Sequence, residues 1–149
     1  VLVEGDDPLE PVADAARSIM DGHCVLSREL AHRAHYPPID VLQSVSRLAH
    51  EITPPPVLAA GARLRELLAL YRAKEDLITI GAYARGSDPR VDEAIERLPD
   101  IERFLRQGLD ERVSTEEGDA ALLSLFPVEA DAQASTSTSG AGAGTPARS

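Results

Sequence analysis

The segment from Tyr36 to Arg47 carries the two side chains of this sequence that are best suited to chemistry. Pro37 and Pro38 fix φ and remove two N–H donors, so they present Tyr36 from a stiff, extended segment that is a poor helix. Farther along, a Ser-x-Ser turn is expected to present Arg47. A rigid aromatic ring and a rigidly aimed guanidinium in one short segment suit a nucleotide site that is shared between subunits.

A structural role for the same two side chains is the alternative. A tyrosine before proline commonly packs half-buried, and an arginine after serine commonly pairs with a carboxylate of its own domain. Positioned charges are structural more often than functional. The residue types alone therefore favour packing for Tyr36 and an internal ion pair for Arg47.

Two other polar groups could suggest a metal site. Four carboxylates lie close together but lack the ligand alternation and central glycine of a calcium loop, so they predict a solvated acidic turn: Asp6, Asp7, Glu10 and Asp14. Four histidines lack a zinc-binding pair with a neighbouring glutamate base, so they are predicted to be surface or turn residues: His23, His32, His35 and His50. No metal site is predicted.

Composition narrows the classes of partner and compartment. With 15 basic and 25 acidic residues the net charge is -10, which argues against nucleic acid and acidic membrane surfaces. No apolar run approaches the ~20 residues of a spanning helix, so a soluble protein is expected. The single cysteine, Cys24, cannot form an internal disulfide; we expect a small buried side chain in a reducing compartment, which favours the cytoplasm.

The first region, residues 1–52, is expected to be the end of an α/β domain. The chain opens on Val-Leu-Val-Glu, as though cut at a strand, and is interpreted as the C-terminal piece of a longer protein. Strand and helix patterns alternate, which is typical of α/β layering. The expected elements are a strand at Val1–Glu4, a helix at Ala13–Met20, a strand at Cys24–Leu26, and a helix from the N-cap Ser27 to His35 with Leu30 and Ala34 inside.

The second region, residues 53–126, is expected to be a small bundle of helices. The prolines after Thr53 mark a domain boundary, with Thr53 as the helix cap. The expected helices are Val57–Tyr71, Asp76–Ile80, one capped by Asp88 with Pro89 at its first position, one from Asp100 to Gly108, and one opened by the capping box Ser114–Glu117. Residues 127–149 bury almost nothing and are expected to form a disordered tail.

Several of these segments together resemble one family. The motifs are Tyr36-Pro-Pro-Ile-Asp, Ser44-Val-Ser-Arg, Ile80-Gly-Ala-Tyr and Gly86-Ser-Asp-Pro-Arg. In this order they resemble the flagellum-specific ATPases, kin to the type III secretion ATPases and to the catalytic subunits of rotary ATP synthases. The resemblance implies that residues 1–52 are the C-terminal part of a RecA-like P-loop NTPase domain and that residues 53–126 are the helical domain that follows it.

The resemblance also implies roles for the two side chains. Tyr36 matches the aromatic residue that packs on the adenine of ATP, and Arg47 matches an arginine finger that reaches the γ-phosphate held by the neighbouring subunit. The chain contains no Gly-x-x-x-x-Gly-Lys-Ser/Thr loop, so ATP and Mg²⁺ would be held mainly by other parts of the parent enzyme. The isolated chain is expected to be inactive as an ATPase.

The partners implied by the resemblance are those of protein export. They are a homohexamer, export chaperones and flagellar substrates, stator or stalk proteins, and peripheral contact with the membrane export gate, all in the cytoplasm at the base of the flagellar export apparatus. The virulence-type secretion ATPase is the alternative, although Ile80-Gly-Ala-Tyr favours the flagellar branch. For the isolated chain, a non-enzymatic helical module that binds chaperone or substrate is a second alternative.

Overall fold

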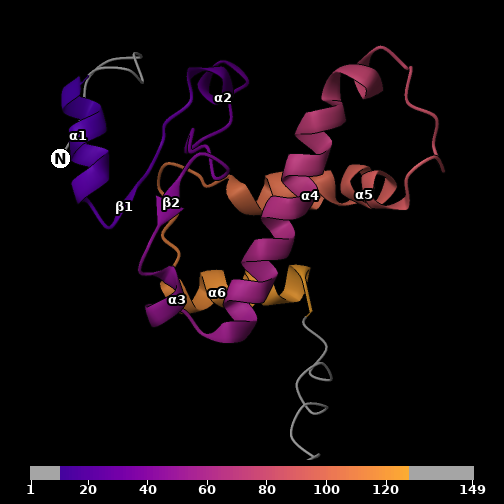
Figure 1. Ribbon diagram of the computed structural model, residues 1–149. Helices are drawn as coiled ribbons and strands as arrows, with labels where there is room; N and C mark the ends of the chain where they lie inside the picture. Colours follow the sequence, from indigo (N-terminus) through magenta and orange to yellow (C-terminus); the bar gives the residue numbers. More distant parts are fainter. Residues whose placement is uncertain (1–10, 128–149) are drawn as a thin grey trace, which may run out of the picture.

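The computed structural model describes residues 11–127, which form a mostly helical fold with one pair of short strands (Figure 1). The elements are α1 (Pro11–Ile19), β1 (Gly22–His23), α2 (Arg28–His32), β2 (Val45–Ser46), α3 (Ala49–Ile52), α4 (Pro55–Thr79), α5 (Pro89–Leu105) and α6 (Thr115–Leu125). The expected strand at Val1–Glu4, most of the acidic turn and the tail from residue 128 onward lie outside the described residues.

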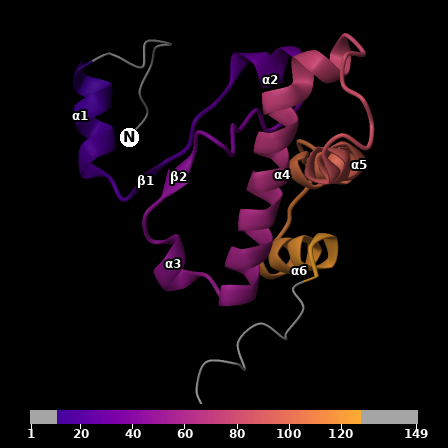
Figure 2. The same ribbon diagram turned by 45° about the vertical axis from the view of Figure 1, so that its right-hand side comes forward.

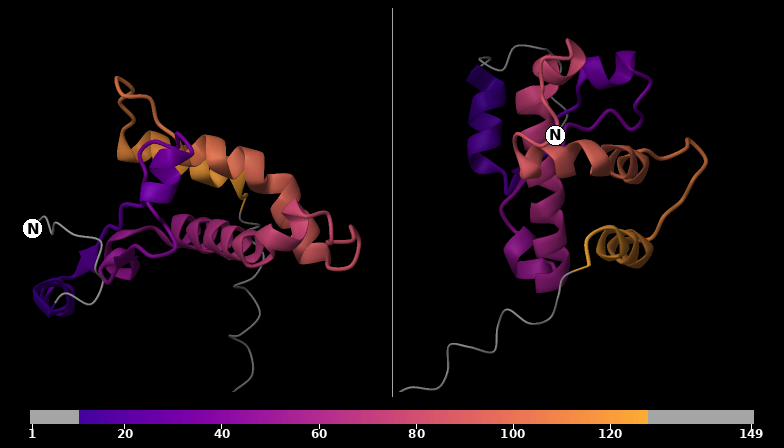
Figure 3. Two further views of the ribbon diagram at one scale, coloured as in Figure 1. Left: turned by 90° about the horizontal axis from the view of Figure 1, so that it is seen from above. Right: turned by 90° about the vertical axis from the view of Figure 1, so that its right-hand side faces the viewer.

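The apolar core lies between α4, α5 and α6. Both α5 and α6 cross α4 on the same side, whereas α1 lies apart from them (Figures 2 and 3). The central buried cluster consists of Ala60, Leu64, Leu67, Ala94, Ile101 and Phe126. Within the described part of the chain, every buried apolar residue comes from position 57 or later. The core therefore belongs to the helical region that the second half of the sequence predicts.

Helix α4 is continuous, which makes the predicted interruption after Tyr71 wrong. The intervening residues favour helix and contain neither glycine nor proline, so nothing stops the helix before Thr79. Gly81 then adopts a φ of 72°, the left-handed conformation that commonly ends a helix. At the other end the N-cap is Pro54, not the expected Thr53, and no side chain caps the helix.

Helix α5 is also continuous, although a new helix was predicted to begin at Asp100. Pro99 lies inside the helix and removes one backbone hydrogen bond. Burial of Val91, Ala94 and Ile101 holds both sides of the proline against the core, which explains why the helix does not break there. The predicted N-cap is confirmed, since the side chain of Asp88 accepts a hydrogen bond from the backbone nitrogen of Arg90.

Helix α6 begins at the predicted capping box. The Ser114 hydroxyl accepts from the backbone nitrogen of Glu117 at 3.2 Å, and the Glu117 carboxylate accepts from that of Ser114 at 2.8 Å. These reciprocal bonds satisfy two donors that the first turn leaves free.

The two strands pair antiparallel, with Gly22 opposite Ser46. A Cβ atom at Gly22 would lie 2.6 Å from the carbonyl oxygen of Val45, so this close approach requires glycine. The strand was expected at Cys24–Leu26 instead; there, only Leu26 forms an isolated bridge, to Ile39. Cys24 is exposed, so its predicted burial is wrong; it lies just after β1 and outside the strand pair.

Helix α2 begins as predicted, because Ser27 accepts from the backbone nitrogen of Leu30. It ends at His32, three positions earlier than expected. Ala34 has a φ of 54° and is exposed, so its predicted place on the inner helix face is wrong. The described residues contain no helix that is long and apolar enough to cross a bilayer.

Candidate functional site

The segment between α2 and β2 is a loop, as the prolines predict, and hydrogen bonds hold it in place. The backbone nitrogen of Asp40 donates to the carbonyl oxygen of Val25 at 2.8 Å. The hydroxyl of Ser44 accepts from the backbone nitrogen of Val25 at 3.0 Å and donates to the carbonyl oxygen of Asp40 at 2.6 Å. The turn at residues 40–44 is therefore fixed at both ends to the chain that leads into α2.

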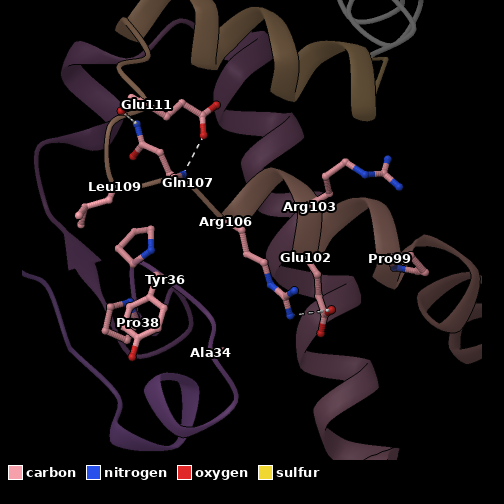
Figure 4. Close-up of a pocket in the computed structure, with 12 residues that line it drawn as sticks. Ala34, Tyr36, Pro38, Pro99, Glu102, Arg103, Arg106, Gln107, Leu109 and Glu111 are labelled. Atoms are coloured by element: carbon pink, nitrogen blue, oxygen red, sulfur yellow. Dashed lines mark hydrogen bonds and ion pairs between the residues drawn. The ribbon is translucent and has the colours of Figure 1, made fainter.

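Tyr36 lies at the edge of an open pocket of about 1260 Å³. The residue is 55% exposed. Figure 4 shows Tyr36 and Pro38 below the pocket, with Gln107 and Leu109, from the segment after α5, above it. The backbone nitrogen of Gln107 donates to the carbonyl oxygen of Tyr36 at 2.9 Å, which ties the two walls together.

Arg47 follows β2 and is exposed. Its backbone nitrogen donates to the carbonyl oxygen of Asp21 at 2.7 Å, whereas its guanidinium has no hydrogen-bond or ion-pair partner within residues 11–127. The expected Ser-x-Ser turn is instead the strand Val45–Ser46, because these residues pair with β1. Arg47 does not line the pocket beside Tyr36, so the structure places the two candidate residues at separate points of the surface.

Asp40, which sequence reasoning named only as part of a motif, lies at the junction between the loop and α4. The residue is 4% exposed. Arg72 Nη1 donates to its two carboxylate oxygens at 2.9 and 3.0 Å, and the backbone nitrogens of Leu42 and Gln43 donate to the same carboxylate. Burial opposes ionisation of Asp40, but the bonds from Arg72 and from Gln43 outweigh it and lower the pKa of the carboxyl group.

We expect Asp40→Asn to lower the free energy of unfolding by about 2 kcal/mol near neutral pH, because Arg72 loses its anionic partner. A lowered pKa in the folded state stabilises the protein above the ordinary aspartate pKa of about 3.9 and loses that contribution as pH falls through the folded value. The difference between wild type and variant should therefore shrink below about pH 4. Urea unfolding at several pH values measures it.

Asp100→Asn serves as the control for this prediction. Asp100 pairs with Arg103 on the surface, with side chains 45% and 77% exposed. Removal of an exposed pair should cost less than about 0.5 kcal/mol. A loss for Asp40→Asn that is no larger than this, or one that persists unchanged at low pH, would contradict the role assigned to the buried carboxylate.

His35 is buried at 6% exposure, which corrects the prediction that all four histidines are surface or turn residues. Its Nδ1 atom accepts from Nε of Arg106 at 3.4 Å. Burial, and then the positive charge of Arg106, lower the pKa of His35, so the neutral ring is favoured. His35 is therefore a second polar anchor between the loop and the helical region, and the described residues contain no group of three or more His, Cys, Asp or Glu that could hold a metal ion.

Two family models match the chain in succession. Residues 1–46 match the nucleotide-binding domain of the ATP synthase alpha/beta family, and residues 53–124 match the C-terminal domain of the T3SS EscN ATPase. The chain is 52% identical over 125 residues to the flagellum-specific ATP synthase of Treponema pallidum, covering 84% of this chain and 28% of the relative. It is 55% identical over 111 residues to the SPI-2 type 3 secretion system ATPase of Salmonella typhimurium, covering 74% and 26%.

Solved structures give the same relationship. The assembled ATPase EscN from the type III secretion system of enteropathogenic E. coli is similar with a TM-score of 0.79 at 40% identity, over 84% of this chain and 30% of that one. EscN in complex with its central stalk EscO is similar with a TM-score of 0.73 at 40% identity, over 78% and 29%. The chain belongs to the family of the flagellum-specific ATP synthases and type 3 secretion ATPases.

Proposed function

We propose that this chain forms the C-terminal part of a protein-export ATPase of the flagellar type. Residues 1–52 would complete its RecA-like nucleotide-binding domain, residues 53–126 would form its helical domain, and residues 127–149 would be a tail. The order of the two matching family models supports this division, since one ends at residue 46 and the other begins at residue 53. The chain spans about 28% of the length of its flagellar relative, so catalysis belongs to the larger protein.

The state of Arg47 is the observation that carries this proposal. Its guanidinium is exposed and has no partner within the described residues, so it is available to a phosphate from outside this chain. A planar guanidinium stabilises the charge that spreads over the equatorial oxygens during phosphoryl transfer. The ammonium group of lysine lacks this planar arrangement of donors. We assign Arg47 as an arginine finger that acts in trans on ATP bound by the neighbouring subunit.

Tyr36 is assigned to the base of a second ATP, bound on its own subunit. Its exposed ring borders a pocket whose volume of about 1260 Å³ exceeds the needs of one adenine, and Pro38 and Leu109 add apolar surface. An aromatic ring with apolar neighbours suits stacking on a purine. The separation of Tyr36 from Arg47 fits this division, because each would serve a different nucleotide of the ring.

Residues outside this chain would hold the triphosphate and Mg²⁺. No phosphate-binding Gly-rich loop occurs in the sequence, and the described residues contain no group of three or more His, Cys, Asp or Glu that could hold a metal ion. When bound, Mg²⁺ would neutralise charge on the β- and γ-phosphates. The contribution that we assign to this chain is base packing by Tyr36 and charge stabilisation by Arg47.

Assembly and partners follow from the same relatives. EscN is described as an assembled ATPase and as a complex with a central stalk protein. By analogy we assign this chain to a cytoplasmic homohexamer that contacts a stalk, export chaperones and flagellar substrates at the export gate. A virulence-type ATPase is the second candidate, favoured by the 55% identity to the SPI-2 ATPase, whereas the flagellar relative matches over 125 rather than 111 residues.

The nucleotide assignment is tested by Tyr36→Ala in the full-length assembled ATPase. Loss of stacking on the base should raise KM for ATP about tenfold, with a smaller effect on kcat. Tyr36→Phe is the matched control and should behave like wild type, since the Tyr36 hydroxyl has no partner within the described residues. Steady-state ATP hydrolysis against ATP concentration measures both variants, and an unchanged KM for Tyr36→Ala would remove the assignment.

A further inference from the structure

Two arginines of α4 hold the turn that lies between Tyr36 and Arg47. Arg65 Nη2 donates to the carbonyl oxygens of Val41 and Ser44 at 2.8 and 2.7 Å. Arg72 Nη1 donates to both carboxylate oxygens of Asp40. Positions i and i+7 lie about two turns apart on one face of a helix. Arg65 and Arg72, the α4 clamp, therefore grip neighbouring points of residues 40–44.

The turn held by the clamp leads directly into the arginine finger. Ser44 is followed by β2, and Arg47 comes immediately after it. On the other side, the backbone of Arg47 is hydrogen-bonded to Asp21. The backbone position of Arg47 thus depends on the strand pair on one side and on the turn held by the α4 clamp on the other. The clamp is the contact between this turn and α4, and α3 connects Arg47 to the start of the same helix.

The same helix offers a contrast that separates positioning from general stability. Arg63 forms ion pairs with Glu66 in α4 and with Glu93 in α5, and neither partner belongs to the loop. The exposed side chain of Arg65 donates instead to two carbonyl oxygens of the loop. Loss of these bonds leaves no buried charge without a partner, because the Arg65 side chain is exposed to water. The arrangement of Arg65 is therefore better suited to fixing the place of the turn than to holding the fold together.

We propose that Arg65 and Arg72 are positioning residues that set the location of Arg47 relative to the helical region. The inference rests on the proposed role of Arg47 in trans. Phosphoryl transfer depends on placement, and a displacement of about 1 Å can cost as much as 10²-fold in rate. Loss of the clamp lowers kcat by displacing Arg47 and leaves the affinity for ATP nearly unchanged.

A double-mutant cycle on kcat in the full-length assembled ATPase tests this. Arg72→Met should lower kcat about tenfold when Arg47 is present. In the Arg47→Ala background the same substitution should have no further effect, because the group it positions is gone. Arg65→Met should follow the same pattern; it leaves no buried charge unpaired and so keeps the test valid even if Arg72→Met folds poorly.

Arg63→Met is the matched control, since the side chains of Arg63 and Arg72 are 35% and 34% exposed. Its kcat should equal that of wild type. Unchanged kcat in both clamp variants, or equal losses with and without Arg47, would overturn the positioning role while leaving the role of Arg47 intact. Unchanged turnover in Arg47→Ala alone would overturn the arginine finger and the clamp with it.

Discussion

Arg47→Ala in the full-length assembled ATPase should lower kcat about 10³-fold while leaving the Kd for ATP nearly unchanged. The guanidinium contacts charge that develops in the transition state, and the ground-state triphosphate is held by other residues of the enzyme. An interaction made only in the transition state changes kcat rather than binding. Single-turnover hydrolysis and equilibrium binding of a labelled nucleotide measure the two quantities separately.

Two further variants test whether the loss is specific to the guanidinium of Arg47. Arg47→Lys should recover little activity, because an ammonium lacks the planar fork of donors. Arg85→Ala is the matched control: Arg85 is also exposed and has no partner within the described residues, but it lies in the loop between α4 and α5. It should hydrolyse ATP like wild type. Full activity of Arg47→Ala, or an equal loss in Arg85→Ala, would contradict the assignment.

Ile101→Ala should lower the free energy of unfolding by about 3 kcal/mol. Ile101 is fully buried, and it belongs to the cluster that joins α4, α5 and α6. The shorter side chain loses transfer free energy and leaves a cavity that the close-packed neighbours fill only in part. Because Pro99 already weakens the backbone of α5 nearby, the helix depends on this burial. Urea unfolding followed by circular dichroism measures the loss.

Ile80→Ala is the control for this second prediction. Ile80 is 74% exposed at the end of α4, so the same chemical change should alter stability by less than about 0.5 kcal/mol. A similar small loss for Ile101→Ala would show that α5 does not depend on packing around its proline. A larger loss for Ile80→Ala would show that another surface covers it.

The helix starts that the sequence predicts correctly depend on residues that lie within one helical turn of each other. Ser27, Asp88 and the Ser114–Glu117 box are examples, because a cap needs only a side chain and a backbone nitrogen close in sequence. The continuity of α5 through Pro99 is different, since it depends on burial against α4. Local propensity is overridden there by tertiary packing.

The candidate site shows the same difference between features set by nearby residues and features set by residues far apart in the sequence. Tyr36 and Arg47 were found through motifs within a short segment, and their roles remain proposals. The buried state of His35 was missed because its partner, Arg106, lies 71 residues away. The ion pair of Asp40 with Arg72 spans 32 residues. The sequence shows that Arg65 and Arg72 of the α4 clamp are seven positions apart. Only the fold shows that both side chains contact this loop.

The polar character of the junction between the loop and the helices has a thermodynamic consequence. His35 and Asp40 are the buried polar residues of the described chain. Among its partly buried apolar residues, Val41 is the only one before Pro54 that packs against the apolar cluster. Separation of the two parts would expose little apolar surface, so its heat-capacity change and its dependence on denaturant would both be small. Melting of the helices exposes far more. We therefore expect the free energy for release of the loop to depend on ionic strength and on protonation more strongly than that for unfolding of the three helices.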